Sequence, residues 1–362
     1  MSRLRGRLSL LVLAAFGTLL GFLLLEAGAR VLAVREERRQ GRLDRDLAKA
    51  KGPGARAEVT LGQIIQKSAN PRIVYELRPR LDVRFGGGRL TTSDGAYRGR
   101  DVAEPKPPGV YRMVGIGDSY MFGQGVSDEE TYLARLPRAA PVVASGRLLE
   151  TVNLAVPGFN TVMEVELLRE RVAHLDPDLI LIEIVGNDLD LPNFLWTAVD
   201  PWTPRRSFLL DFVRGRVNAL GSRTAGAAEL VEAPREDDGR AETFSRDADH
   251  VPARYASMVG LPAFNEAIDE LAALGHARHV PVLALTHGVW FEREMKEALE
   301  RNGILVLILR PALRRRARGL GAPDYARSPL ALSPRDLHPS ALGHEVIAEE
   351  VAAWLKTRIS GR

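Results

Sequence analysis

Val114-Gly-Ile-Gly-Asp-Ser-Tyr-Met-Phe-Gly123 is the stretch that decides how this chain folds. The apolar run Tyr111–Ile116 leads into it and is typical of a buried strand, which ends abruptly at Gly117-Asp118-Ser119. A serine at the carboxyl end of a parallel strand lies where open α/β sheets place their chemistry. Gly-Asp-Ser alone is a short pattern that an ordinary turn or helix cap also explains, so its meaning depends on the rest of the chain.

Strand and helix patterns alternate from residue 109 to the end of the chain. Further strand-like runs are Glu150–Leu154, Asp178–Ile184, Val280–Thr286 and Leu305–Leu309. Helical spacing of apolar residues separates them, as in Val162, Val165, Leu168, Val172 and Leu175. This alternation predicts an α/β domain over 109–362, with a parallel sheet between layers of helices. Residues 189–251 show no sustained period and are expected to form an insertion, either a lid or a loop excursion.

The first hundred residues divide into four segments. Residues 1–7 carry three arginines, and residues 8–25 contain no charge, which favours a transmembrane signal anchor. Cleavage at Ala27-Gly28-Ala29 is the alternative. The segment 26–70 is expected to be a charged juxtamembrane helix and linker, and 71–108 a strand-rich extension of the α/β domain. Arginines after the span favour a cytoplasmic domain, whereas the short tail before a signal-like run favours export, and we expect the α/β domain to be extracytoplasmic (periplasmic).

Composition narrows the function classes. The chain has 362 residues, 45% of them hydrophobic and 27% charged, with a formal net charge of +4. Its arginines are scattered or mixed with glutamates, so no nucleic-acid partner is expected. With no cysteine in the chain, disulfides, thiolate nucleophiles and cysteine-ligated zinc are excluded.

Four short blocks line up with the expected strand ends. They are Gly117-Asp118-Ser119, Asn153 to Gly158, Gly186-Asn187-Asp188 and Asp336-Leu-His338. A serine hydroxyl needs a neighbouring base to act as a nucleophile, and His338 is suited to take its proton while Asp336 orients the imidazole. The oxyanion needs donors, which the backbone N–H groups of Ser119 and Gly158 and the Asn187 amide can supply, each worth about 3–4 kcal/mol.

On these blocks the chain resembles the SGNH subgroup of the GDSL esterase/lipase family. Ser119, Gly158, Asn187 and His338 match the four residues that name the subgroup, and Asp336 matches its triad acid; Tyr120 stands where leucine is common. The resemblance covers about residues 110–355. It implies a flavodoxin-like three-layer α/β/α sandwich with a five-stranded parallel sheet. It also implies hydrolysis without metal or cofactor, although Asp336, His338 and His344 together could suggest a metal site.

The expected function is that of a serine esterase with an acyl-enzyme on Ser119. O-acetyl groups of cell-envelope polysaccharide are the substrate hypothesis, which rests on the expected location and the resemblance. The expected partners are an ester-bearing substrate, either acetylated glycan or lipid, and the membrane through the N-terminal helix. Two alternatives are an O-acyltransferase that uses the same triad and a non-catalytic envelope or glycan-binding protein on this fold.

Overall fold

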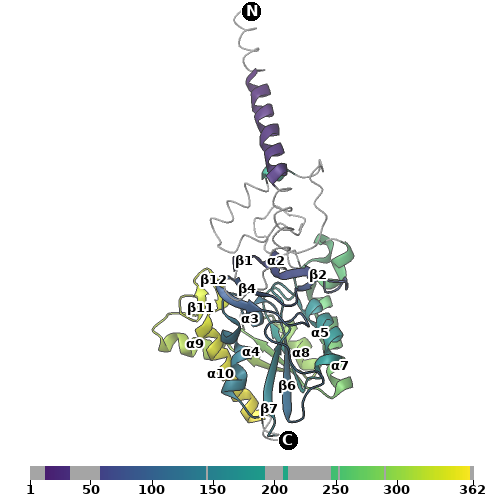
Figure 1. Cartoon of the computed structure of the whole chain (residues 1–362), viewed down its shortest axis with the longest axis vertical. Helices are drawn as coiled ribbons and strands as arrows, with labels where there is room; N and C mark the ends of the chain where they lie inside the picture. Colours follow the sequence, from purple (N-terminus) through teal and green to yellow (C-terminus); the bar gives the residue numbers. More distant parts are fainter. Residues whose placement is uncertain are drawn as a thin grey trace, which may run out of the picture. The chain divides into compact units, whose positions relative to one another are not determined.

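The computed structural model describes residues 13–32, 58–143, 146–191, 207–210, 246–251, 253–288 and 291–358 (Figure 1). The basic tail 1–7 lies outside the described residues, as do much of the segment 26–70 and most of the insertion 189–251. The chain divides into two compact units. One comprises Met1–Ala55 and Thr197–Gly226, and the other Arg56–Trp196 and Ala227–Arg362.

A five-stranded parallel sheet forms the centre of the second unit. Its strands in chain order are β6 (Val110–Ile116), β7 (Leu148–Asn153), β8 (Leu179–Ile184), β9 (Val282–Thr286) and β10 (Leu305–Ile308). Their order across the sheet is β10-β9-β8-β6-β7, and every neighbouring pair is parallel. This is the flavodoxin-like order, and it confirms the predicted fold class. The chain reverses direction across the sheet between β6 and β8, so their carboxyl ends flank a crevice.

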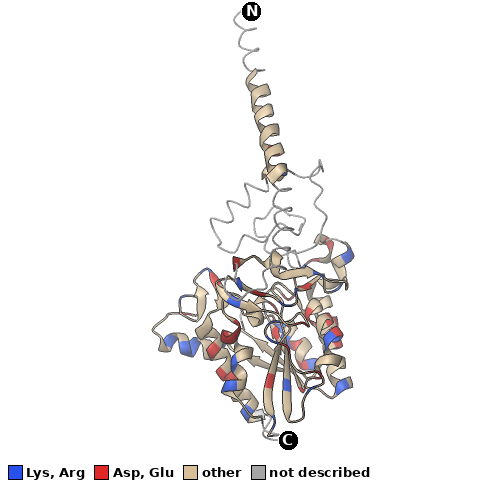
Figure 2. Ribbon diagram, viewed as in Figure 1, with Lys and Arg blue, Asp and Glu red and all other residues tan. Residues whose placement is uncertain are grey.

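Helices cover both faces of this sheet (Figure 1). One layer contains α5 (Thr161–Leu175), α7 (Gly260–Arg278) and α8 (Arg293–Arg301); the other contains α4 (Tyr132–Ala139), α9 (Arg310–Gly319) and α10 (Ala341–Arg358). All six residues of β8 are buried, as expected for a strand covered on both faces. Acidic and basic residues are interspersed along most of the outer helices, whereas α9 carries arginines and no acidic residue (Figure 2).

A small strand-rich extension precedes the sheet in the same unit. It holds β1 (Glu58–Val59), β4 (Asp82–Phe85) and β5 (Gly88–Thr91) in one sheet, α2 (Leu61–Ile64), and the hairpin of β2 (Ile65–Lys67) and β3 (Tyr75–Leu77). It begins at Glu58, within the segment that the sequence suggests as a linker. A Cβ atom on Gly88 would lie 2.3 Å from the Val126 carbonyl, so only glycine allows β5 to approach the segment around Val126 this closely.

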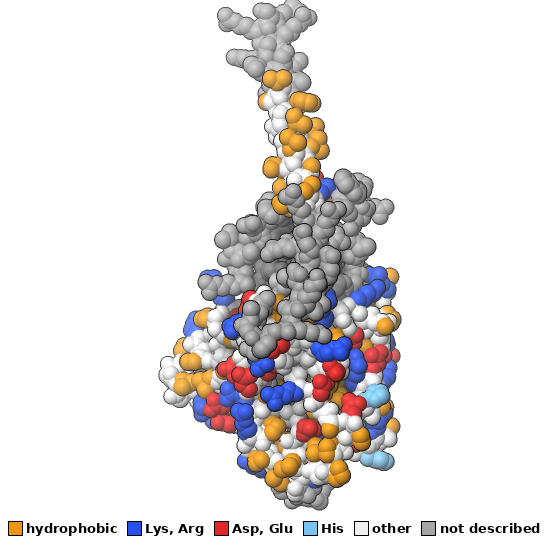
Figure 3. Space-filling model, viewed as in Figure 1, with side chains coloured by type: hydrophobic (Ala, Val, Ile, Leu, Met, Phe, Trp, Pro, Cys, Tyr) orange, Lys and Arg blue, Asp and Glu red, His pale blue; other side chains and the backbone are white. Residues whose placement is uncertain are grey.

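The first unit contains an apolar helix, Leu13–Leu32, with mean hydropathy 1.6. Its hydrophobic side chains are exposed along its length (Figure 3). Near its end, the Glu26 carboxylate accepts hydrogen bonds from the N–H groups of Phe208 and Leu209, at 3.0 and 2.9 Å. The helix is long and apolar enough to cross a membrane, and a signal sequence shares these properties.

Candidate active site

Ser119 lies at the first position of the short helix α3 (Ser119–Phe122), directly after the β6 strand. Asp118 caps this helix, because its carboxylate accepts the Tyr120 N–H at 2.9 Å. The helix ends at Gly123, whose φ of 87° is accessible to glycine at low cost. Asp118 is 2% exposed, and burial raises the pKa of its carboxyl group. The local sequence therefore presents the serine at the carboxyl edge of the sheet.

The structure brings Ser119, His338 and Asp336 into one hydrogen-bonded row. The Oγ atom of Ser119 is 2.7 Å from Nε2 of His338, and Nδ1 of His338 is 2.6 Å from Oδ1 of Asp336. Asp336 and His338 lie on strand β12 (Asp336–Pro339), which pairs with β11 (Ala331–Ser333) just before α10. The hydrogen bond to His338 lowers the pKa of Asp336. An ionised Asp336 accepts the Nδ1–H, which leaves Nε2 free to accept the serine proton.

Two further predicted residues lie at the same edge of the sheet. Gly158 follows β7 with a φ of 79°, and its N–H makes no hydrogen bond within the part of the chain that the structure describes. Asn187 follows β8, and its Nδ2 donates to the Phe159 carbonyl at 3.5 Å, which connects it to the Gly158 loop. Asp188 holds the Asn187 turn, because its carboxylate accepts the Val185 N–H and, at 2.7 Å, the Thr161 hydroxyl.

A second histidine adjoins this row. Nε2 of His287, at the end of β9, is 2.9 Å from Oε1 of the fully buried Glu183. The Tyr120 ring lies beside both imidazoles, with ring centroids 4.9 Å from His287 and 4.8 Å from His338. The sequence places His287 at a strand end without indicating a role. The Tyr120 ring therefore packs against the imidazole of His338, the residue that the sequence suggests as the base.

Arg98, in the segment after β5, is a structural residue of the site that sequence reasoning missed. Its guanidinium donates to the carbonyl groups of Phe122, Gly123 and Val126, at 2.6, 2.8 and 2.7 Å. It also pairs with Asp128 at 2.8 Å. The loop that follows the nucleophile helix is therefore fastened by one buried cation. No pattern in the sequence around Arg98 indicates that this arginine is buried.

His344 does not join the predicted residues. It is fully buried on α10, and its Nδ1 accepts the Tyr132 N–H at 3.3 Å. Burial lowers the pKa of His344 well below its ordinary value. Among the residues that the structure describes, no group of three or more histidine or acidic side chains is arranged to hold a metal ion.

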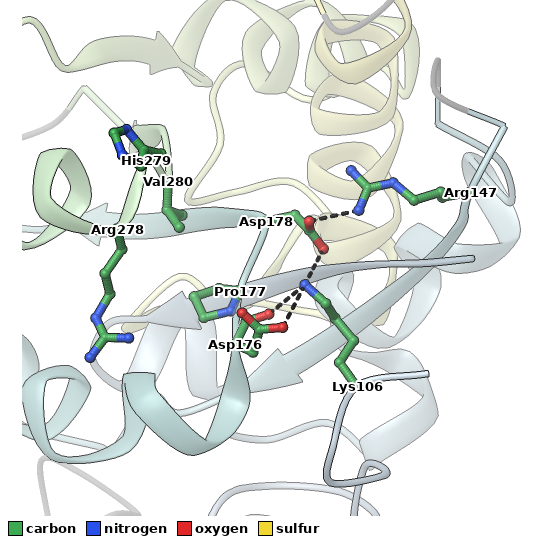
Figure 4. Close-up of a pocket in the computed structure, with 8 residues that line it drawn as sticks. All are labelled: Lys106, Arg147, Asp176, Pro177, Asp178, Arg278, His279 and Val280. Atoms are coloured by element: carbon green, nitrogen blue, oxygen red, sulfur yellow. Dashed lines mark hydrogen bonds and ion pairs between the residues drawn. The ribbon is translucent and has the colours of Figure 1, made fainter. Parts of the chain in front are cut away.

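A polar cavity of about 440 Å³ lies at the opposite edge of the sheet, lined by residues that precede the strands (Figure 4). Asp178 is 2.7 Å from Nη1 of Arg147 and 2.9 Å from Nζ of Lys106, and Lys106 is 3.2 Å from Asp176. These charges neutralise one another. The cluster fastens the segment before β6 to the start of β8, away from the catalytic edge.

The chain is similar to one protein family and to several solved structures. The model of the GDSL-like lipase/acylhydrolase family matches residues 116–346. No curated protein matches the sequence. Similar solved structures include TesA (14% identity, 68% of this chain and 98% of that chain, TM-score 0.39). A second is LAE5, an alpha/beta hydrolase enzyme from the metagenome of Lake Arreo, Spain (18% identity, 68% of this chain and 94% of that chain, TM-score 0.39). A third is the psychrotrophic esterase EstA from Pseudoalteromonas sp. (12% identity, 67% of this chain and 98% of that chain, TM-score 0.39).

Proposed function

This chain belongs to the GDSL-like lipase/acylhydrolase family and is an enzyme that acts on ester bonds, and we propose that it works through an acyl-enzyme formed on Ser119. The observation that carries this proposal is the row of contacts from Ser119 through His338 to Asp336, at 2.7 and 2.6 Å. Both distances are those of short hydrogen bonds between a nucleophile, a base and an orienting carboxylate.

The mechanism follows from these contacts. The Oγ atom of Ser119 attacks the ester carbonyl carbon while Nε2 of His338 takes the serine proton. Asp336 accepts the Nδ1–H and stabilises the imidazolium that forms. The tetrahedral intermediate then collapses, the C–O bond to the alcohol breaks, and His338 returns its proton to the leaving alkoxide. Water repeats the sequence on the acyl-serine ester and releases the carboxylic acid.

Three donors are available to the oxyanion of each tetrahedral intermediate. The Ser119 N–H is at the start of a helix and has no partner within it, the Gly158 N–H is unpaired among the described residues, and Asn187 carries a side-chain amide. Donors fixed before the reaction stabilise developing charge without reorganisation, and one such donor contributes about 10²–10³-fold to kcat.

Labelling with a fluorophosphonate probe tests the nucleophile. We expect the full chain to be labelled once, at Ser119, and Ser119→Ala to remain unlabelled. Ser127→Ala is the matched control, since Ser127 lies in the next turn and caps Asp128–Glu130. Absence of label on Ser119 in the folded protein would sink the acyl-enzyme mechanism.

We propose O-acetyl groups of cell-envelope polysaccharide as the substrate, with the enzyme held at the membrane and its catalytic domain outside the cytoplasm. The apolar helix Leu13–Leu32 and the three arginines of residues 1–7 support an anchor. Purified enzyme should release acetate from acetylated glycans faster than fatty acid from long-chain esters, and the reverse order would reject this substrate. A phosphatase reporter fused at the carboxyl end should be active, because it functions only outside the cytoplasm.

A further inference from the structure

The Pro157–Gly158 peptide group carries one of the proposed oxyanion donors. This peptide is trans, so its plane is fixed and its C=O and N–H point in opposite directions. The Gly158 N–H is unpaired among the described residues and is therefore free to donate to a substrate oxygen. A group that holds the Pro157 carbonyl at the opposite edge of this planar unit therefore also fixes the direction of the Gly158 N–H.

The group that holds this carbonyl is the hydroxyl of Tyr75. It donates to the Pro157 oxygen at 2.8 Å in a buried hydrogen bond, and Tyr75 is fully buried. The Tyr75 ring also packs edge-on against Phe159, with ring centroids 5.3 Å apart at 71°. One residue of β3 thus contacts the oxyanion loop on both sides of Gly158.

The hairpin that carries Tyr75 is itself fixed. Tyr75 pairs with Lys67 in the antiparallel β2–β3 register. Beside it, Glu76 pairs with Arg171 of α5 at 3.2 Å, and Arg72 pairs with Glu166 of α5 at 3.4 Å. Because α5 begins directly after the oxyanion loop, the hairpin and the loop are fastened to the same helix.

We propose that Tyr75 is a positioning residue for ester hydrolysis, which fixes and polarises the Gly158 N–H through the carbonyl of the same peptide group. This inference rests on the proposed function, in which Gly158 stabilises the oxyanion. A hydrogen bond to a peptide carbonyl strengthens the N–H of that peptide as a donor, because hydrogen bonds in a chain polarise one another. The extension before the matched family region, residues 58–101, then forms part of the catalytic scaffold.

The test compares Tyr75→Phe with Tyr97→Phe in the full chain. Tyr97 is the matched control because it lies in the same extension, is 4% exposed, and accepts the Val102 N–H at 2.8 Å through its hydroxyl. Hydrolysis of p-nitrophenyl acetate gives kcat and KM, with enzyme concentration taken from the amount of Ser119 that the fluorophosphonate labels. Because unfolded protein is not labelled, it is not counted in the enzyme concentration and does not lower the value of kcat.

Tyr75→Phe should lower kcat about three- to tenfold with KM unchanged, the effect of one neutral hydrogen bond felt in the transition state. Tyr97→Phe should keep the wild-type kcat. Placing 4-aminophenylalanine at position 75, which restores a donor, should recover most of the lost kcat. A kcat for Tyr75→Phe within twofold of wild type, or an equal loss of kcat in Tyr97→Phe, would overturn the role of Tyr75. Labelling of Ser119 in the same experiment would still support the acyl-enzyme mechanism. An unlabelled wild-type Ser119 would overturn both.

Discussion

Replacing Arg98 with methionine removes a buried cation while keeping the length of the side chain. The Arg98 side chain is 3% exposed and donates to three carbonyl groups of the buried residues Phe122, Gly123 and Val126. It also pairs with the Asp128 carboxylate, 2.8 Å away, and donates to the Arg89 carbonyl at 3.4 Å. Methionine fills similar space but satisfies none of these acceptors, so the variant tests the polar contacts and not the packing.

The expected loss of stability is large. A buried acceptor left without a partner costs about 1–3 kcal/mol. This cost applies to the Val126 carbonyl, because the Gly123 carbonyl still accepts the Val126 N–H at 3.3 Å and the Phe122 carbonyl still accepts Nδ2 of Asn153 at 3.5 Å. Breaking a buried charge pair by removing one partner costs about 3–5 kcal/mol, and this larger cost sets the expected loss. Against a total of about 5–15 kcal/mol for a typical domain, Arg98→Met should fold but melt about 6–20 °C lower.

Thermal and urea unfolding of the detergent-solubilised full chain, followed by circular dichroism, measures this loss. Arg89→Met is the control, since Arg89 lies in the same extension, is 42% exposed and pairs with Asp82 at the surface at 3.1 Å. An exposed pair contributes about 0–1 kcal/mol, so this variant should behave like wild type. If Arg98→Met lost less than about 1 kcal/mol relative to Arg89→Met, the carbonyl contacts would not be what holds the loop after the nucleophile helix.

Two further outcomes follow from the charged groups near the site. Asp336→Asn should lower kcat for p-nitrophenyl acetate about 10³–10⁴-fold with little change in KM, because His338 loses the acceptor that fixes its tautomer. The control Asp324→Asn changes an exposed carboxylate and should leave kcat unchanged. A loss of kcat below tenfold in Asp336→Asn would assign the orienting role to another residue. Burial, and then the neighbouring Asp188, raise the pKa of Glu164 well above its ordinary 4.5, so the folded protein retains a proton that the unfolded chain releases. Stability should therefore fall as pH rises from 4.5 towards the raised pKa, by up to about 1.4 kcal/mol per pH unit. Over this pH range, the melting temperature should fall less steeply with pH for Glu164→Gln than for wild type. Glu170→Gln, which changes an exposed carboxylate on the same helix, should behave like wild type. Equal pH slopes for Glu164→Gln and wild type would contradict the assignment to Glu164.

The five strands of the sheet were predictable because each is a short, largely apolar run. Burial on both faces removes any need for alternation in the central strand β8, whereas the edge strands β7 and β10 are only partly buried. The boundaries shifted by no more than two residues at each strand start, as in β7, which begins at Leu148 instead of Glu150. The pairing of Asp336 with His338 two residues later was also readable, although a short loop was expected there and the structure has the strand β12. These features depend on neighbours in sequence.

Helix α5 shows where local pattern fails. Glu164 and Glu166 lie outside its apolar stripe, yet both are buried, at 1% and 8% exposure. The first two turns are enclosed from several sides, because α7 packs on α5 and the extension reaches it through Asn70 and Arg72. Periodicity describes one helix and carries no information about a second or third neighbour.

The sequence by itself determined the alternation of strands and helices, the turn that exposes Ser119, and the local pairing of Asp336 with His338. Only the tertiary structure decided that His338 meets Ser119 across 219 residues of chain, and that Tyr75 and Arg98 of the extension reach the loops around the nucleophile. The physical reason is range. Strand formation, caps and turns are set by a residue's nearest neighbours in the chain. By contrast, a buried hydroxyl or guanidinium is placed by the carbonyl groups that need it, and those belong to distant segments.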